Sequence, residues 1–162
     1  MPAHDFPFLS HISKLQPVHH GGAAQLIAKG LDPETLIDFS ANILPVDEPQ
    51  AVSSAIQNSD SRPYPDPHCT ALRNALAEHH SIEPRNILCA NGSVELIAAI
   101  ARTCLREEDC ALIVGPTFGE YEAAVRLVNA TPIIVLTTNI DDIIESIEQH
   151  QPALVFLCNP NN

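Results

Sequence analysis

The sequence predicts an α/β fold in which a parallel sheet is covered by helices on both faces. From residue 86 onward, short apolar runs alternate with segments of helical periodicity, so that strands and helices follow one another in turn. The apolar runs are continuous rather than alternating, which is typical of strands that are buried on both faces. The last run is followed by no helical segment within the 162 residues. We therefore expect the sheet to be incomplete and the sequence to be a fragment of a longer protein.

The first half of the chain is predicted to hold short helices separated by irregular segments. Residues 1–20 show no periodic pattern, and helices are expected over residues 50–58 and 69–80. Between these helices, residues 62–67 contain three prolines, which exclude a helix and favour a stiff, extended loop. We therefore expect Tyr64, within this loop, to stand on a rigid support.

Residues 86–105 are predicted to form a strand, a tight turn and a helix, with Ile87–Cys89 as the strand. A strand that enters a helix through a Gly-Ser turn leaves free N–H groups at the start of the helix. Together with the helix dipole, those groups suit a phosphate. We expect Ser93 to cap this helix and Glu95 to lie in its first turn. The apolar face of the helix is predicted to contain Ile97, Ile100, Ala101 and Cys104.

The rest of the chain continues the alternation of strand and helix. The run at 131–137 is apolar and β-branched, which favours a strand, and two acidic residues begin the helical pattern at 141–150. In order, we expect a strand at 110–114, a turn at 115–117, a helix at 118–129, a strand at 131–137, a helix at 141–150 and a strand at 153–158.

Composition excludes several classes of function. The formal net charge is −12, with only eight Lys and Arg residues, which argues against a nucleic-acid surface. No apolar run approaches the roughly 20 residues that span a membrane, and the N-terminus does not resemble a signal peptide. The five cysteines form no C-x-x-C pair, and we expect them to be reduced core residues of a cytoplasmic protein. The adjacent His19 and His20 do not predict a metal site.

Six short motifs follow one another along the chain in an order that resembles a known family. They are His20–Gly22, Asp38–Asn42, Tyr64–Pro67, Asn91–Ile97, Pro116–Tyr121 and Asn159–Asn162. This pattern resembles the N-terminal part of the fold-type I pyridoxal-phosphate (PLP) enzymes, the class I/II aminotransferase superfamily. Within it, the branch of histidinol-phosphate aminotransferase and L-threonine-O-3-phosphate decarboxylase is the most similar.

The first two motifs are particularly like the decarboxylase, which acts in cobalamin biosynthesis. The resemblance thus implies a threonine-phosphate decarboxylase, with a histidinol-phosphate-type aminotransferase as the alternative. It also implies a division into an N-terminal arm with a small-domain segment, residues 1–45, and the first part of the PLP-binding large domain, residues 46–162.

The resemblance assigns a cofactor, PLP, and the residues that would bind it. Gly92, Ser93 and Val94 would hold the cofactor phosphate, in agreement with their predicted place at the start of a helix. Phe118 would stack on the pyridine ring, and Asn162 would form a hydrogen bond with the phenolic oxygen of the cofactor.

Further roles concern the substrate and a second subunit. The resemblance implies that Tyr64 reaches the cofactor phosphate of the neighbouring subunit, and hence a homodimer. It places His20, Gly21 and Asn42 near the substrate, which would be a small phosphorylated amino acid or amine.

The lysine that PLP enzymes need has no counterpart in these residues. The chain contains two lysines, Lys14 in the irregular N-terminal segment and Lys29 at a predicted helix end, and we interpret both as surface residues. In the family, the Schiff-base lysine and the Asp that pairs with the pyridine nitrogen follow the N-P-T-G motif, inside which this sequence stops. We therefore expect no catalytic residue within the chain, which would be inert by itself.

Two other classes of function compete with this interpretation. A nucleotide-binding oxidoreductase domain would need three spaced glycines, whereas Gly92 stands alone. A non-enzymatic remnant is the other alternative, and the missing lysine favours it for the chain as given. The sequence does not separate decarboxylation from transamination, because the residues that decide between them lie mostly elsewhere.

Overall fold

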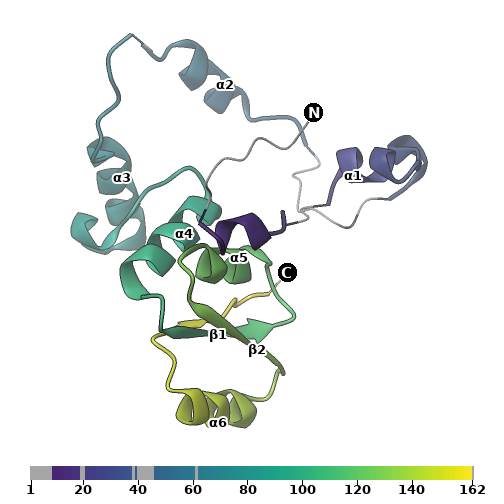
Figure 1. Ribbon diagram of the computed structural model, residues 1–162. Coiled ribbons are helices and arrows are strands. Elements are labelled where there is room, and N and C mark those ends of the chain that lie inside the picture. The colour runs from purple at the N-terminus through teal and green to yellow at the C-terminus, as the bar shows by residue number, and fades with distance from the viewer. Residues whose placement is uncertain (1–8, 19–20, 38, 40–45, 61, 162) are drawn as a thin grey trace. The chain divides into compact units, whose positions relative to one another are not determined.

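The computed structural model describes residues 9–18, 21–37, 39, 46–60 and 62–161 (Figure 1). Three strands and six α-helices lie in these ranges, with three short 3-10 helices. The strands are β1 (Cys110–Gly115), β2 (Thr131–Leu136) and β3 (Leu154–Phe156). The helices are α1 (Ala23–Ala28), α2 (Gln50–Gln57), α3 (Thr70–His80), α4 (Ser93–Cys104), α5 (Glu120–Leu127) and α6 (Ile140–His150), and the 3-10 helices are η1 (Ile12–Lys14), η2 (Pro33–Thr35) and η3 (Pro84–Asn86).

The chain divides into two compact units. One comprises Met1–His19 together with Ala90–Asn162, and the other comprises His20–Cys89. The sheet and α4, α5 and α6 all belong to the first unit. The division that the sequence predicted, between residues 45 and 46, stays a prediction.

The sheet is parallel and has the strand order β2-β1-β3. The central strand β1 pairs with both neighbours, and its Leu112 lies opposite Ile133 of β2 on one side and Val155 of β3 on the other. Figure 1 shows α6 on the opposite side of the strands from α4 and α5. The predicted α/β fold, with a parallel sheet covered on both faces, is therefore confirmed.

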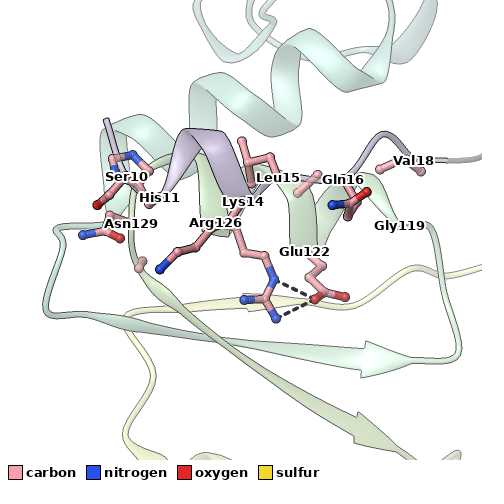
Figure 2. Close-up of a pocket in the computed structure, with 12 residues that line it drawn as sticks. Ser10, His11, Lys14, Leu15, Gln16, Val18, Gly119, Glu122, Arg126 and Asn129 are labelled. Carbon is pink, nitrogen blue, oxygen red and sulfur yellow. Dashed lines mark hydrogen bonds and ion pairs between the residues drawn. The ribbon is translucent and has the colours of Figure 1, made fainter. Parts of the chain in front are cut away.

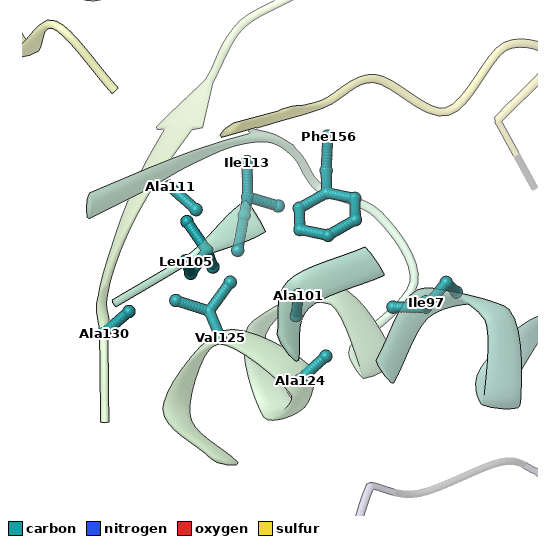
Figure 3. Packing of buried hydrophobic residues seen from close by; sticks show 9 residues of the cluster. All are labelled: Ile97, Ala101, Leu105, Ala111, Ile113, Ala124, Val125, Ala130 and Phe156. Atoms are coloured by element: carbon teal, nitrogen blue, oxygen red, sulfur yellow. The ribbon is translucent and has the colours of Figure 1, made fainter. Parts of the chain in front are cut away.

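The core lies between β1 and the helix pair α4 and α5 (Figure 3). Alanines stand where the helices meet: Ala101 of α4 is fully buried and Ala124 of α5 nearly so, which lets the two backbones approach closely. Successive residues of β1 point to opposite faces, so buried Leu112 faces away from this cluster, toward α6. The cluster consists of Ile97, Ala101, Leu105, Ala111, Ile113, Ala124, Val125, Ala130 and Phe156.

The predicted strand Ile87–Cys89 is wrong. These residues follow η3 without joining the sheet, and the Leu88 side chain is 69% exposed. The physical reason is the boundary between the two units, which falls directly after Cys89. A short apolar run becomes a strand only when a neighbouring strand pairs with it, and the described residues offer none here.

Two predictions about buried faces also need correction. In α4, Ile97 and Ala101 are buried together with the following Leu105, but Ile100 and Cys104 are exposed. The helix therefore buries a narrower face than its apolar residues suggested. All five cysteines are free, as expected, but each is exposed or only half-buried, so they are not core residues.

No helix in the described part of the chain is long and apolar enough to cross a bilayer. In the same residues, no group of three or more His, Cys, Asp or Glu side chains is placed to hold a metal ion.

Candidate functional site

Two loops meet at the carboxyl edge of the sheet. Because β1 and β3 are parallel neighbours with Ile113 opposite Phe156, the residues that follow them leave the sheet side by side. The loop after β1 contains Pro116 and Thr117, and the turn after β3 contains Asn161. In open α/β sheets, this edge is where ligands bind.

The side chain of Asn161 joins these two loops. Its Nδ2 donates a hydrogen bond to the carbonyl oxygen of Pro116 at 2.6 Å. Its Oδ1 accepts a hydrogen bond from Thr117 Oγ1 at 3.0 Å. Both the donor and the acceptor of the amide are thus used across the sheet edge. Thr117 and Asn161 lie in two of the motifs described above, but the sequence assigned no role to either, because no short-range pattern marks a pair 44 residues apart.

Phe118 follows Thr117 and rests on an aromatic stack. Its ring meets Tyr121 edge-on, with centroids 6.0 Å apart, and Tyr121 in turn stacks on buried Phe156 at 4.8 Å. A hydrogen bond with Cys158, helped by partial burial, raises the pKa of the Tyr121 hydroxyl. Phe118 is therefore half-buried and supported by Tyr121, which the sequence analysis did not assign.

The start of α4 has a conformation that requires glycine. Gly92, the N-cap residue, has φ +84° and ψ 170°, a region that is nearly restricted to glycine. No side-chain cap is formed here, so the predicted capping role of Ser93 is wrong, and Ser93 is instead the first residue of the helix. The turn is held by Glu95, whose Oε2 accepts hydrogen bonds from Asn91 N at 2.6 Å and Asn91 Nδ2 at 3.1 Å.

The first turn of α4 fits a phosphate group. Among the described residues, none accepts a hydrogen bond from the backbone amides of Ser93 and Val94. A Cβ built on Gly92 would meet no atom within 4 Å, so the space beside the turn is open. The nearby Glu95 carboxylate accepts its hydrogen bonds from Asn91 and not from Ser93 or Val94. The Ser93 and Val94 amides, together with the helix dipole, therefore remain available to an anion.

The N-terminal segment borders this turn. Residues Leu15–Val18 line an open pocket of about 280 Å³, which Val94 of α4 and Glu120 of α5 also line. Val94 in the first turn of α4 and the helix that follows Phe118 thus line one pocket.

A larger groove, of about 530 Å³, lies along α5 (Figure 2). Lys14 and His11 line it from the N-terminal segment, and Arg126 and Glu122 line it from α5. Arg126 Nη2 lies 2.7 Å from Glu122 Oε1, as the dashed lines in Figure 2 show. None of the residues predicted to bind cofactor or substrate lines this groove.

The remaining predicted residues are not placed together by the structure. Tyr64 belongs to the other unit and is 99% exposed. Gly21, also in that unit, has φ +45° and is half-buried. His20, Asn42 and Asn162 lie outside the described residues.

Comparison with known proteins identifies the family. The model of the family "Aminotransferase class I and II" matches residues 34–162. A histidinol-phosphate aminotransferase of Caldanaerobacter subterraneus is 34% identical over 133 residues, which cover 76% of this chain and 38% of the relative. The chain thus spans well under half the length of this relative.

Solved structures agree with this assignment. An L-threonine-O-3-phosphate decarboxylase from Porphyromonas gingivalis is 32% identical, with a TM-score of 0.52 over 62% of this chain and 30% of that one. The fold is also that of a histidinol-phosphate aminotransferase from Sinorhizobium meliloti, 19% identical with a TM-score of 0.71 over 96% of this chain and 43% of that one. The chain belongs to the class I and II aminotransferase family of fold-type I PLP enzymes.

Proposed function

We propose that this chain forms the phosphate-binding and ring-stacking part of a PLP-dependent aminotransferase whose substrate is histidinol phosphate. The choice of substrate is supported by the curated relatives, which are named histidinol-phosphate aminotransferases. On this point we prefer the alternative of the sequence analysis to its first choice, the decarboxylase.

One observation carries the proposal, namely the open first turn of α4 with its two unengaged amides. The backbone N–H groups of Ser93 and Val94 donate to the phosphate, and Gly92 allows the backbone to approach it closely. Phe118, supported by Tyr121, packs on one face of the pyridine ring. When bound, PLP supplies the electron sink that stabilises negative charge at the substrate Cα.

The other predicted residues complete the proposed site. Asn162 donates a hydrogen bond to the phenolic oxygen of the cofactor, and His20, Gly21 and Asn42 contact the substrate. Tyr64 reaches the phosphate of a neighbouring subunit, so that the protein acts as a homodimer. We further propose that it acts in the cytoplasm.

The lysine to which the cofactor attaches is proposed to come from outside residues 1–162. Lys14 lines the groove along α5, and Lys29 follows the end of α1 in the other unit. Neither lysine is among the residues that line the pocket beside Val94 of α4. Residues 1–162 alone are therefore expected to be inactive.

Decarboxylation of L-threonine phosphate is the second candidate. It is supported by the decarboxylase structure that is 32% identical to this chain, and by the His20–Gly22 and Asp38–Asn42 motifs. Both substrates carry a phosphate and an amine, so the residues assigned above serve either reaction.

The experiment that tests the proposal uses the full-length protein that carries this sequence. It is incubated with PLP and either histidinol phosphate plus 2-oxoglutarate, or L-threonine phosphate alone. Formation of glutamate in the first mixture supports the aminotransferase. Release of carbon dioxide in the second mixture, without glutamate in the first, establishes the decarboxylase instead. Absence of both products refutes the proposal.

A further inference from the structure

Thr117 and Asn161 occupy matched positions on the two loops at the sheet edge. Thr117 directly precedes Phe118, and Asn161 directly precedes Asn162. The hydrogen bond between the Thr117 hydroxyl and Asn161 Oδ1 therefore joins the residues just before two proposed cofactor contacts. The second bond, from Asn161 Nδ2 to Pro116, fixes the backbone on the same side.

The two hydrogen bonds of Asn161 are long-range contacts between two loops rather than parts of a local turn. Each joins residues 44 or 45 positions apart, and each crosses from the end of β1 to the end of β3. The Phe118 ring is supported on one side by Tyr121, and the Phe118 carbonyl oxygen accepts a hydrogen bond from the Tyr121 amide. The hydrogen bonds of Asn161 hold the two residues that precede Phe118, Pro116 and Thr117.

We propose that Thr117 and Asn161 are positioning residues, which fix the loop after β1 so that Phe118 meets the cofactor ring in one orientation. The inference rests on the proposed function and adds two residues to it. Its physical basis is preorganisation, because a loop held in its bound conformation loses less entropy when the ligand binds.

The test replaces the hydroxyl of Thr117 in the full-length protein. Thr117→Val keeps the shape but removes the hydrogen bond, whereas Thr117→Ser keeps the hydroxyl. Thr103→Val is the matched control, because Thr103 Oγ1 donates only to Ala99 O within α4. For each variant, the Kd of PLP and the circular dichroism of the bound cofactor are measured. Amide hydrogen exchange of residues 117–119 is followed without cofactor.

We expect Thr117→Val to raise the Kd of PLP about 3- to 10-fold, to change the cofactor dichroism and to accelerate amide exchange at residues 117–119. Thr117→Ser should restore all three readouts, and Thr103→Val should leave them unchanged. In a Phe118→Leu background, Thr117→Val should cost little further affinity, because its effect passes through Phe118.

The inference is overturned if Thr117→Val leaves the PLP Kd and dichroism unchanged, or if its effect on affinity adds fully to that of Phe118→Leu. Failure of the wild-type protein to bind PLP would refute the proposed function itself, and the positioning role with it. Normal PLP binding by the wild type, with no difference among the variants, refutes the positioning role alone.

Discussion

The side chain of Val18 occupies the space that a Cβ on Gly119 would need. A Cβ built on Gly119 would lie 2.9 Å from Val18 Cγ1, closer than real contacts allow. Gly119 has φ −62° and ψ −18°, which any residue adopts, so the backbone conformation does not require glycine here. Glycine is required instead because Val18 leaves no room for a Cβ. The N-terminal segment is thereby seated directly beside the residue that follows Phe118.

This packing predicts the effect of Gly119→Ala. The added methyl group should destabilise the chain by about 1–3 kcal/mol, as overpacking does, and should displace the segment around Val18. Urea unfolding of Gly119→Ala, Val18→Ala and the double variant measures the coupling. Val18→Ala removes the clashing Cγ atoms, so Gly119→Ala should cost less in that background. Fully additive free energies would show that the two residues do not compete for space.

Gly92→Ala tests the start of α4. Because Gly92 has φ +84° and ψ 170°, alanine should cost about 1–3 kcal/mol of stability and should weaken PLP binding by turning the first amides of the helix. Gly30→Ala is the control, since Gly30 also has a positive φ, +73°, but lies beside α1 in the other unit. Both variants should lower stability, and only Gly92→Ala should raise the Kd of PLP. Equal effects on PLP binding would argue against a phosphate site at Gly92.

Glu95 is expected to hold the turn before α4. Its carboxylate accepts two hydrogen bonds from Asn91, so Glu95→Ala should accelerate amide exchange of Asn91. Glu95→Gln keeps a neutral acceptor and should show an intermediate rate. Exchange measured by NMR at constant pH gives the comparison, and an unchanged Asn91 rate in Glu95→Ala would exclude this role.

The turn before α3 predicts a response to acid. Hydrogen bonds with Thr70, through its side chain and its backbone amide, and with the His68 amide lower the pKa of Asp66 from 3.8 to about 2. The pKa of Asp66 is lower in the folded protein than in the unfolded chain, so the ionised carboxylate stabilises the folded state. This stabilisation is complete above about pH 3.8 and is lost as the pH falls toward 2.

The measurement for this site is an NMR titration of the Asp66 carboxyl carbon, assigned by its absence in Asp66→Asn. We expect a midpoint near 2, together with loosening of the start of α3 over the same range. A midpoint near the ordinary value of 3.8 would mean that these hydrogen bonds do not persist in solution.

The parts of the fold that sequence patterns predicted are those that depend on local composition. The residues of β1 are continuously apolar, which is typical of a strand buried on both faces of a parallel sheet. The start of α6 is marked in the sequence by two acidic residues in its first turn. The strand proposed at Ile87–Cys89 failed because pairing depends on a distant neighbour, which no local pattern reveals. The bonds of Asn161 were missed for the same reason, since they join residues 44 and 45 positions apart.

A crystal structure of the full-length protein with PLP tests the central claim most directly. The account predicts that the cofactor phosphate accepts hydrogen bonds from the Ser93 and Val94 amides, and that the Phe118 ring stacks on the pyridine. A phosphate bound elsewhere, for example in the groove beside Lys14 and Arg126, with the first turn of α4 left empty, would contradict it.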